Sequence, residues 1–110
     1  RLVGPAKAMG AALFAEKITA QEADRMGLIW EHTEDEAFEA HWRARAAHLA
    51  QGPTEAYRRT KKALRASLGN TLEEQLNLEA REQGRAGKSR DFKEGVMAFL
   101  EKRKAQFEGR

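Results

Sequence analysis

Cysteine is absent from the 110 residues of this chain, which excludes disulfides, thiolate metal ligands and a cysteine nucleophile. Long apolar runs are absent too, and no stretch approaches the length of a membrane-spanning helix. No charged start followed by an apolar segment marks a signal peptide. Because nothing here calls for an oxidising compartment or a bilayer, we expect a cytoplasmic protein without a membrane partner.

A strong excess of charge of one sign is also missing. The chain has 20 Lys and Arg against 17 Asp and Glu, a net charge of +3, which is far from the balance of a dedicated nucleic-acid binder. The densest basic stretch is "YRRTKKALR", which holds Arg58, Arg59, Lys61, Lys62 and Arg65. Tyr57 is its only aromatic residue, so a solvated helix face is the better interpretation, and we expect no nucleic-acid partner.

The signatures of catalytic and metal sites are scarce. The nine glycines stand singly at helix ends and breaks, so no glycine-rich phosphate loop is encoded. Besides His32, the chain has His41 and His48, which are seven residues apart and so lie about two helical turns from each other. That distance is too great for the i,i+4 pair of a helical metal site. We therefore predict no metal ligand and no catalytic histidine.

The carboxylates do not supply a catalytic candidate either. Glu22, Glu36 and Glu74 occupy capping positions, and most others are expected in solvent or near helix starts, where the helix dipole favours them. A catalytic Glu would need burial to raise its pKa into a useful range. No Glu here has apolar neighbours on both sides, so we predict no catalytic residue in the chain.

What is present is a succession of helix signals, and the length fits one domain over residues 1–110. Helix starts are marked by Gly4-Pro5, by Pro53 and Ser89, and by the capping boxes Thr19–Glu22, Thr33–Glu36 and Thr71–Glu74. Helix ends are marked by Gly27, by Gly52, by Gly69-Asn70 and by Gly87. The pattern predicts six helices, with "LIW" at residues 28–30 as the only plausible strand or extended segment.

The last predicted helix carries an apolar stripe made by Phe92, Val96, Phe99 and Leu100. Phe99 and Lys102 are three residues apart, so on a continuous helix their side chains would lie one turn apart on the same side. In a structural interpretation, Phe99 packs in the core and Lys102 faces solvent. In a functional one, Phe99 packs against a flat heteroaromatic ring and Lys102 meets a nearby phosphate.

Three stretches, in order and spanning nearly the whole chain, resemble the C-terminal part of enoyl-CoA hydratase/isomerase (crotonase-like) proteins. The first is "RLVGPAKAMGAALFAEKITAQEADRMGLIW", with the family pattern A-x-E-A-x-x-x-G-L-V at its core. The second is "LAQGPTEAYRRTKKAL", and the third is "SRDFKEGVMAFLEKRKAQFEG", similar to the family's closing helix D-F-x-E-G-x-x-A-F-x-E-K-R. "GLIW" and "SLGNTLEEQL" look most like the branch acting on ring-epoxidised phenylacetyl-CoA.

The resemblance implies an all-α, orthogonally packed C-terminal domain of about six helices, without the ββα spiral core of the family. It also implies a parent assembled as a trimer or a hexamer of paired trimers. In the family, the oxyanion hole and the acidic residues that move protons belong to that core. The chain opens on Arg-Leu-Val without Met, as if cut from something longer, and we expect it to be inactive alone.

For Phe99 and Lys102 the resemblance implies a role in binding coenzyme A, often that of a neighbouring subunit. CoA carries an adenine ring and a 3′-phosphate, which suit an aromatic face and an ammonium. No cofactor is expected, because CoA is part of the thioester substrate. Two alternatives remain open: a structural helical oligomerisation module without a ligand, and a basic helical nucleic-acid binder using Arg58 to Arg65.

Overall fold

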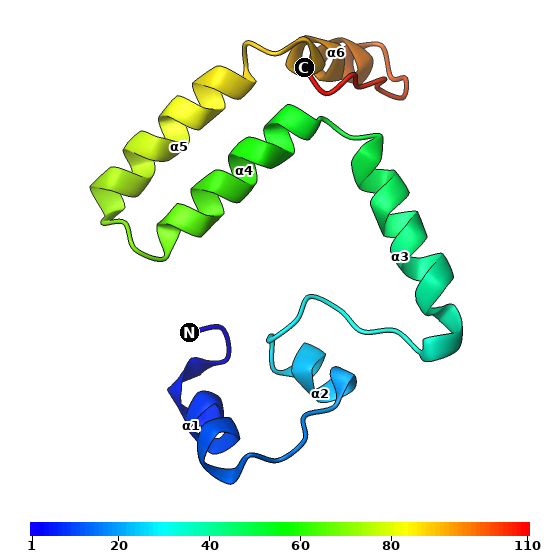
Figure 1. Cartoon of the computed structure of the whole chain (residues 1–110). Helices are drawn as coiled ribbons and strands as arrows, with labels where there is room; N and C mark the ends of the chain where they lie inside the picture. The colour runs from blue at the N-terminus through cyan, green and yellow to red at the C-terminus, as the bar shows by residue number, and fades with distance from the viewer. The chain divides into compact units, whose positions relative to one another are not determined.

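The computed structural model describes all residues 1–110 and is helical, with no strand. Six helices follow one another along the chain, as predicted (Figure 1). Their bounds are α1 Gly4–Phe14, α2 Ala20–Arg25, α3 Asp35–Ala50, α4 Thr54–Ser67, α5 Leu72–Ala86 and α6 Arg90–Leu100. None of them combines the length and the apolar character needed to cross a bilayer. The all-α class and the six helices are therefore confirmed.

Side-chain caps set the starts of three helices. At α2 the Thr19 hydroxyl accepts from the Glu22 N–H at 3.2 Å, and the Glu22 carboxylate accepts from the Thr19 N–H at 3.1 Å. The same reciprocal pair links Thr71 and Glu74 at the start of α5. These bonds satisfy N–H groups that a helix start leaves unpaired, and they lower the pKa of both Glu side chains. At α6 the Ser89 hydroxyl accepts from the Phe92 N–H at 3.0 Å.

Two expectations about local structure are wrong. The Thr33–Glu36 capping box does not form, because α3 begins only at Asp35, which leaves Thr33 one residue too early to be the N-cap. The "LIW" segment forms bends and not a strand. Its first residue, Leu28, donates its N–H to the Ala23 carbonyl at 2.8 Å, after Gly27 has reversed the chain at a φ of +75°. This backbone bond turns the segment back onto the end of α2.

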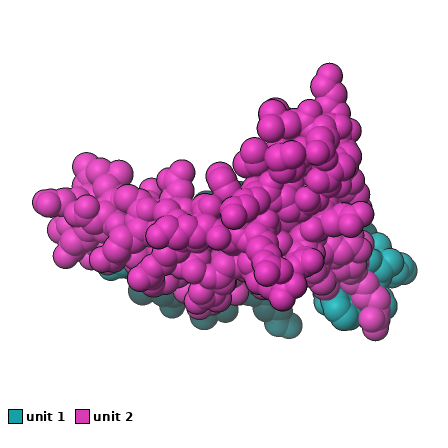
Figure 2. Space-filling view, turned by 90° about the horizontal axis from the view of Figure 1, so that it is seen from above, with its two compact units in different colours: residues 1–42 teal, residues 43–110 magenta.

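The chain divides into two compact units, Arg1–Trp42 and Arg43–Arg110 (Figure 2). The first contains α1, α2 and the beginning of α3, and the second contains the rest of α3 together with α4, α5 and α6. The expectation of one domain over residues 1–110 stays a prediction.

Within the second unit, α4 and α5 lie side by side as an antiparallel hairpin (Figure 1). The Gln75 side chain donates to the Ala63 carbonyl at 3.2 Å, close to the turn that joins the helices. Farther along, Glu82 of α5 pairs with Arg59 and Lys62 of α4. These bonds connect the two helices at several positions along their length, so α4 and α5 are the most closely associated pair of helices in the chain.

The buried apolar core is very small: it consists of Ala23, Leu78 and Ala98. Large apolar side chains are exposed instead, among them Phe14 at 75% and Trp30 at 85%. Exposed apolar surface on this scale is unusual for a self-contained soluble protein and is typical of surfaces that meet other protein. The helices are therefore formed and capped locally, while most of their apolar faces are left uncovered.

Candidate functional site

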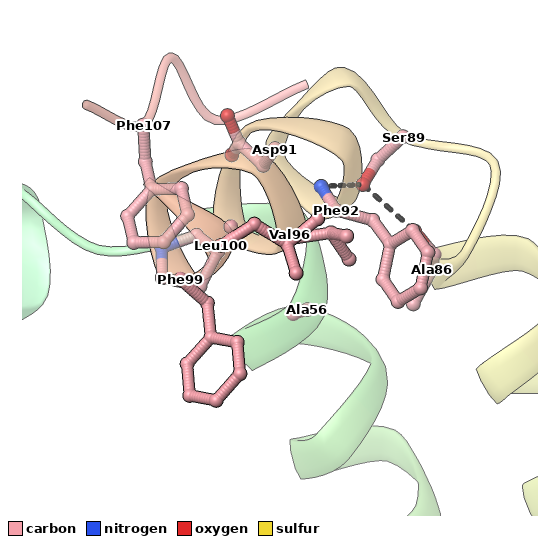
Figure 3. A pocket seen from close by; sticks show the side chains of 11 residues that line it. Ala56, Ala86, Ser89, Asp91, Phe92, Val96, Phe99, Leu100 and Phe107 are labelled. Carbon is pink, nitrogen blue, oxygen red and sulfur yellow. Dashed lines mark hydrogen bonds between the residues drawn. The ribbon is translucent and has the colours of Figure 1, made fainter. Parts of the chain in front are cut away.

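An apolar pocket of about 390 Å³ lies at the end of the hairpin, in the second unit. α6 provides most of its wall, α4 and α5 each add an alanine, and the C-terminal segment adds an aromatic ring. The lining includes Ala56, Ala86, Asp91, Phe92, Val96, Phe99 and Phe107 (Figure 3). Such a surface suits a flat apolar ring and offers few groups for chemistry.

Phe99 extends from α6 beside this pocket, and its residue surface is 82% exposed (Figure 3). The core interpretation of Phe99 therefore does not hold within this chain. The ring is not covered by the helices of its own unit, and both its face and its edge are open to another molecule. An exposed aromatic beside a pocket of matching character is an arrangement that stacks on ligand rings.

Lys102 does not lie on the helix, contrary to the spacing argument. α6 ends at Leu100, and Lys102 has a left-handed backbone with a φ of +54°. Its N–H donates to the Phe99 carbonyl at 3.3 Å, and the next N–H, of Arg103, donates to the Ala98 carbonyl at 3.0 Å. This is the Schellman ending, in which Gly is the usual left-handed residue. A Lys costs about 1 kcal/mol there, and its ammonium has no hydrogen-bond or ion-pair partner in the chain.

The segment after α6 is fastened back onto that helix through Glu94. Its carboxylate takes both Nη groups of Arg103, at 2.6 and 2.9 Å, and accepts the Gln106 N–H at 2.8 Å. The Arg103 guanidinium, and then the Gln106 N–H, lower the pKa of the Glu94 carboxyl to about 2. Arg103 also bonds Glu101, and the two carboxylates raise the pKa of its guanidinium. The Arg103 guanidinium is thus paired with two carboxylates, those of Glu94 and Glu101.

Asp91 fastens the far end of the same segment. Its carboxylate accepts the N–H groups of Glu108 and Gly109 at 2.7 and 2.9 Å, and its own N–H donates to the Arg110 carbonyl at 3.0 Å. Asp91 is only 3% exposed, and its carboxylate points away from Phe99, toward the C-terminal segment (Figure 3).

These roles of Asp91 and Glu94 were not anticipated from the sequence. The "DFKEG" stretch does contain the signal: two carboxylates and a Gly at helical spacing, followed by an Arg and by a polar segment with Phe107. Periodicity cannot show that a non-helical segment returns to the helix that precedes it. The carboxylates in this helix motif therefore bind the residues that follow the helix.

A second nearly buried carboxylate, Glu82, was not nominated either. It is 4% exposed and binds Arg59 at 2.9 Å, Lys62 at 2.7 Å and Arg85 at 3.3 Å. The hydrogen bond from Lys62, with the charges around it, holds its pKa at about 2. A carboxylate so firmly ionised is a poor general base near neutral pH. It organises the hairpin and is not a reaction centre.

The same pairing accounts for much of the basic stretch. Arg58 and Arg59 both bind Glu55, and the hydrogen bond from Arg58 is the main cause that lowers the pKa of Glu55 to about 2. The Arg59 Nε atom is buried without a hydrogen-bond partner. Since these guanidiniums and Lys62 already have carboxylate partners, the surface is less suited to phosphates than the sequence alone implies.

Two of the three histidines take part in separate pairs in the first unit. His32 Nδ1 lies 2.6 Å from an Asp24 oxygen, and His41 Nε2 lies 3.0 Å from a Glu31 oxygen. No group of three or more His, Cys, Asp or Glu side chains is placed to hold a metal ion. His32 and His41 therefore make local pairs with carboxylates.

The sequence of the chain matches known proteins over its whole length. A family model described as "Enoyl-CoA hydratase/isomerase" matches residues 1–110. A "Probable enoyl-CoA hydratase" of Rhodobacter capsulatus is 64% identical over 110 residues, which cover 100% of this chain and 43% of that protein. The "1,2-epoxyphenylacetyl-CoA isomerase" of Escherichia coli is 42% identical, with coverage of 100% and 42%.

Solved structures of enoyl-CoA hydratase/isomerase proteins are also similar to this chain. The crystal structure of a putative enoyl-CoA hydratase/isomerase from Mycobacterium abscessus superposes with a TM-score of 0.93 at 36% identity. The match covers 100% of this chain and 42% of that one. The chain therefore spans less than half the length of the relatives it matches.

Proposed function

We propose that this chain, which belongs to the enoyl-CoA hydratase/isomerase family, is the C-terminal CoA-binding and oligomerisation part of an acyl-CoA enzyme. The intact enzyme would act on thioesters through an enolate held in an oxyanion hole. In this proposal the oxyanion hole and the proton-transferring acids lie in the part of the relatives that the chain does not span. Phe99 and Lys102 bind the CoA moiety, which does not react.

One observation carries the proposal: Phe99 at the end of α6 is an exposed aromatic residue, and Lys102, whose ammonium has no partner in the chain, follows it by three residues. Phe99 is 82% exposed beside the apolar pocket, and the Lys102 N–H is bonded to the Phe99 carbonyl at 3.3 Å. A ring that stacks and a cation free to meet phosphate match the two ends of an adenosine phosphate. Tight binding of such a remote group is one way an enzyme positions a thioester for reaction.

The chain is not proposed to react by itself. Its two nearly buried carboxylates are both engaged, Glu82 by cations and Asp91 by backbone N–H groups, so neither is free to move a proton. We expect the isolated 110 residues to show no hydration or isomerisation of crotonyl-CoA. Measurable turnover by the isolated chain would disprove this point.

The binding role is tested in the full-length protein by measuring CoA affinity calorimetrically. Phe99→Ala and Lys102→Ala should each weaken binding, by about tenfold for the loss of one stacking or charge-assisted contact. Met97→Ala and Lys93→Ala are matched controls, since both residues are exposed on α6 and neither lines the pocket. Unchanged affinity in both test variants would favour a purely structural oligomerisation module.

As a finer proposal, the enzyme isomerises ring-epoxidised phenylacetyl-CoA. The resemblance of "GLIW" and "SLGNTLEEQL" to that branch supports it, whereas the 64% identity to a probable enoyl-CoA hydratase favours hydration. Steady-state assays of the full-length protein on crotonyl-CoA and on 1,2-epoxyphenylacetyl-CoA separate the two. A kcat/KM higher for crotonyl-CoA would overturn the finer proposal and leave the CoA site intact.

The uncovered apolar faces support assembly into a trimer or hexamer. Leu13, Trp30 and Leu72 are among the side chains more than two-thirds exposed in the isolated chain. Surfaces of this kind are buried in obligate assemblies. Sedimentation of the full-length protein should give a trimer or hexamer, and the isolated chain should self-associate. A monomeric full-length protein would contradict this part of the proposal.

A further inference from the structure

We propose that Glu94 and Arg103 are positioning residues that fix Lys102 for the phosphate group of the bound CoA. This inference rests on the proposed function of Phe99 and Lys102. It adds a pair of residues that do not touch the ligand and that fix the backbone from which the Lys102 side chain extends.

The backbone of Lys102 is fixed on both sides. The Lys102 N–H donates to the Phe99 carbonyl at 3.3 Å. The N–H of the next residue, Arg103, donates to the Ala98 carbonyl at 3.0 Å. These two bonds require the left-handed φ of +54° at Lys102. Because Gly is preferred in this conformation, a side chain here is a feature that folding alone does not favour.

The side chain of Arg103 adds the third constraint. It reaches back nine residues to Glu94 and makes two parallel bonds at 2.6 and 2.9 Å, so the residue after Lys102 cannot rotate freely. Glu94 also accepts the Gln106 N–H at 2.8 Å, which directs the following segment along α6. Arg103 thereby has its charge neutralised, while the Lys102 ammonium next to it is left without a partner.

The alternative is that the Glu94–Arg103 pair only anchors the C-terminal segment. Asp91 provides the contrast, since it anchors residues 108 and 109 through backbone bonds and has no bond to Arg103. A general loosening of the segment should follow from changing either carboxylate. Loss of the phosphate contact should follow only from changing the one that holds Arg103.

The test compares the affinities of the full-length protein for CoA and for 3′-dephospho-CoA, whose ratio reports the phosphate contact alone. Lys102→Ala should reduce this ratio about tenfold. Glu94→Gln and Arg103→Gln, which remove the same pair from opposite ends, should each reduce it about threefold. Neither should reduce it further when combined with Lys102→Ala, because all three changes act on one contact. Asp91→Asn should lower Tm and leave the ratio unchanged.

The outcomes separate the two proposals. If Lys102→Ala leaves the ratio unchanged, the proposed role of Lys102 is wrong and the positioning inference is lost with it. If Lys102→Ala reduces the ratio while Glu94→Gln and Arg103→Gln do not, the binding role stands and the positioning inference is overturned. An equal reduction by Asp91→Asn would also overturn it, since any loosening of the segment would then suffice.

Discussion

The α4–α5 hairpin and the α6 region, with the segment after it, each depend on one nearly buried carboxylate, but the carboxylates meet different partners. Glu82 in the hairpin is 4% exposed and meets the cationic side chains of Arg59, Lys62 and Arg85. Asp91 in α6 is 3% exposed and meets the backbone N–H groups of Glu108 and Gly109. The first arrangement joins two helices, and the second fixes the path of an irregular segment.

This difference bears on where a ligand site can be built. Side-chain ion pairs tolerate small shifts because long side chains adjust, whereas two backbone N–H groups on one carboxylate define the chain path closely. The residues proposed to bind CoA lie in the region with backbone bonds, where the backbone of Lys102 is held by two hydrogen bonds. The hairpin then supplies a supporting wall through Ala56 and Ala86.

The largest effect is expected from Glu82→Ala in the hairpin. It removes the carboxylate that Arg59, Lys62 and Arg85 share, and leaves the mostly buried Arg59 with Glu55 as its only anionic partner. Tm of the full-length protein should fall by roughly 10 °C. Hydrogen exchange should accelerate in α4 and α5 and remain unchanged at Glu108 and Gly109. Equal acceleration in both regions would show that the two carboxylates stabilise one unit and not two.

A smaller loss is expected from Asp91→Ala in the α6 region. Two backbone donors lose their acceptor, which costs about 2 kcal/mol and lowers Tm by roughly 5 °C. Here exchange should accelerate at Glu108 and Gly109 and leave α4 and α5 unaffected. Asp91→Asn, which keeps one acceptor oxygen, should lose less. A Tm equal to that of the unchanged protein would mean that the segment is held by Glu94 alone.

Acid should weaken both regions within the same pH window. The pKa values of Glu82 and Glu94 are lowered from 4.5 to about 2 in the folded protein, so their contribution is complete above about pH 4.5. It is lost as the pH falls from about 4.5 toward 2, because the unfolded chain binds these protons first. Thermal melts across this window should show a shallower decline for Glu82→Gln and for Glu94→Gln. A parallel decline in either variant would contradict the assignment for that residue.

The smallest change in Tm is expected from Lys102→Gly. This substitution should raise stability and lower the affinity for CoA. Relief of the left-handed strain should raise Tm by roughly 2–4 °C, while affinity for CoA falls as in Lys102→Ala. Ala15→Gly is the matched control, since Ala15 also has a left-handed φ, of +52°, at the end of α1. It should raise Tm without changing CoA affinity. If Lys102→Gly lowered Tm, the side chain would itself stabilise the fold.

Much of the fold could be predicted from sequence because its signals are local. A capping box needs only four residues, so Thr19–Glu22 and Thr71–Glu74 were correctly identified, as was Ser89 at the start of α6. Thr33–Glu36 has the same T-x-x-E pattern but does not form a capping box, since α3 starts later than the pattern requires. Apolar β-prone residues at 28–30 predicted an extended segment, but a backbone bond to Ala23 makes it a turn.

The geometry around Phe99 and Lys102 could not be predicted from the sequence, and their binding role stays a prediction. The family resemblance indicated Phe99 and Lys102, and Phe99 is exposed beside a pocket, as a binding role requires. The helical spacing of the pair was wrong, because Glu101 ends the helix and Lys102 turns out of it. The contacts of Asp91 and Glu94 span 17 and nine residues to Glu108 and Arg103, and spacing rules for a helix do not reach so far.

The buried Nε atom of Arg59 has a practical consequence. A guanidinium N–H that is shielded from water and lacks an acceptor should exchange slowly and give a resolved resonance in nitrogen-detected spectra. In isotopically enriched protein, that signal would serve as a reporter on the α4–α5 hairpin that needs no mutation. Comparing its chemical shift in the isolated chain and in the full-length protein would reveal whether the rest of the enzyme supplies the missing acceptor.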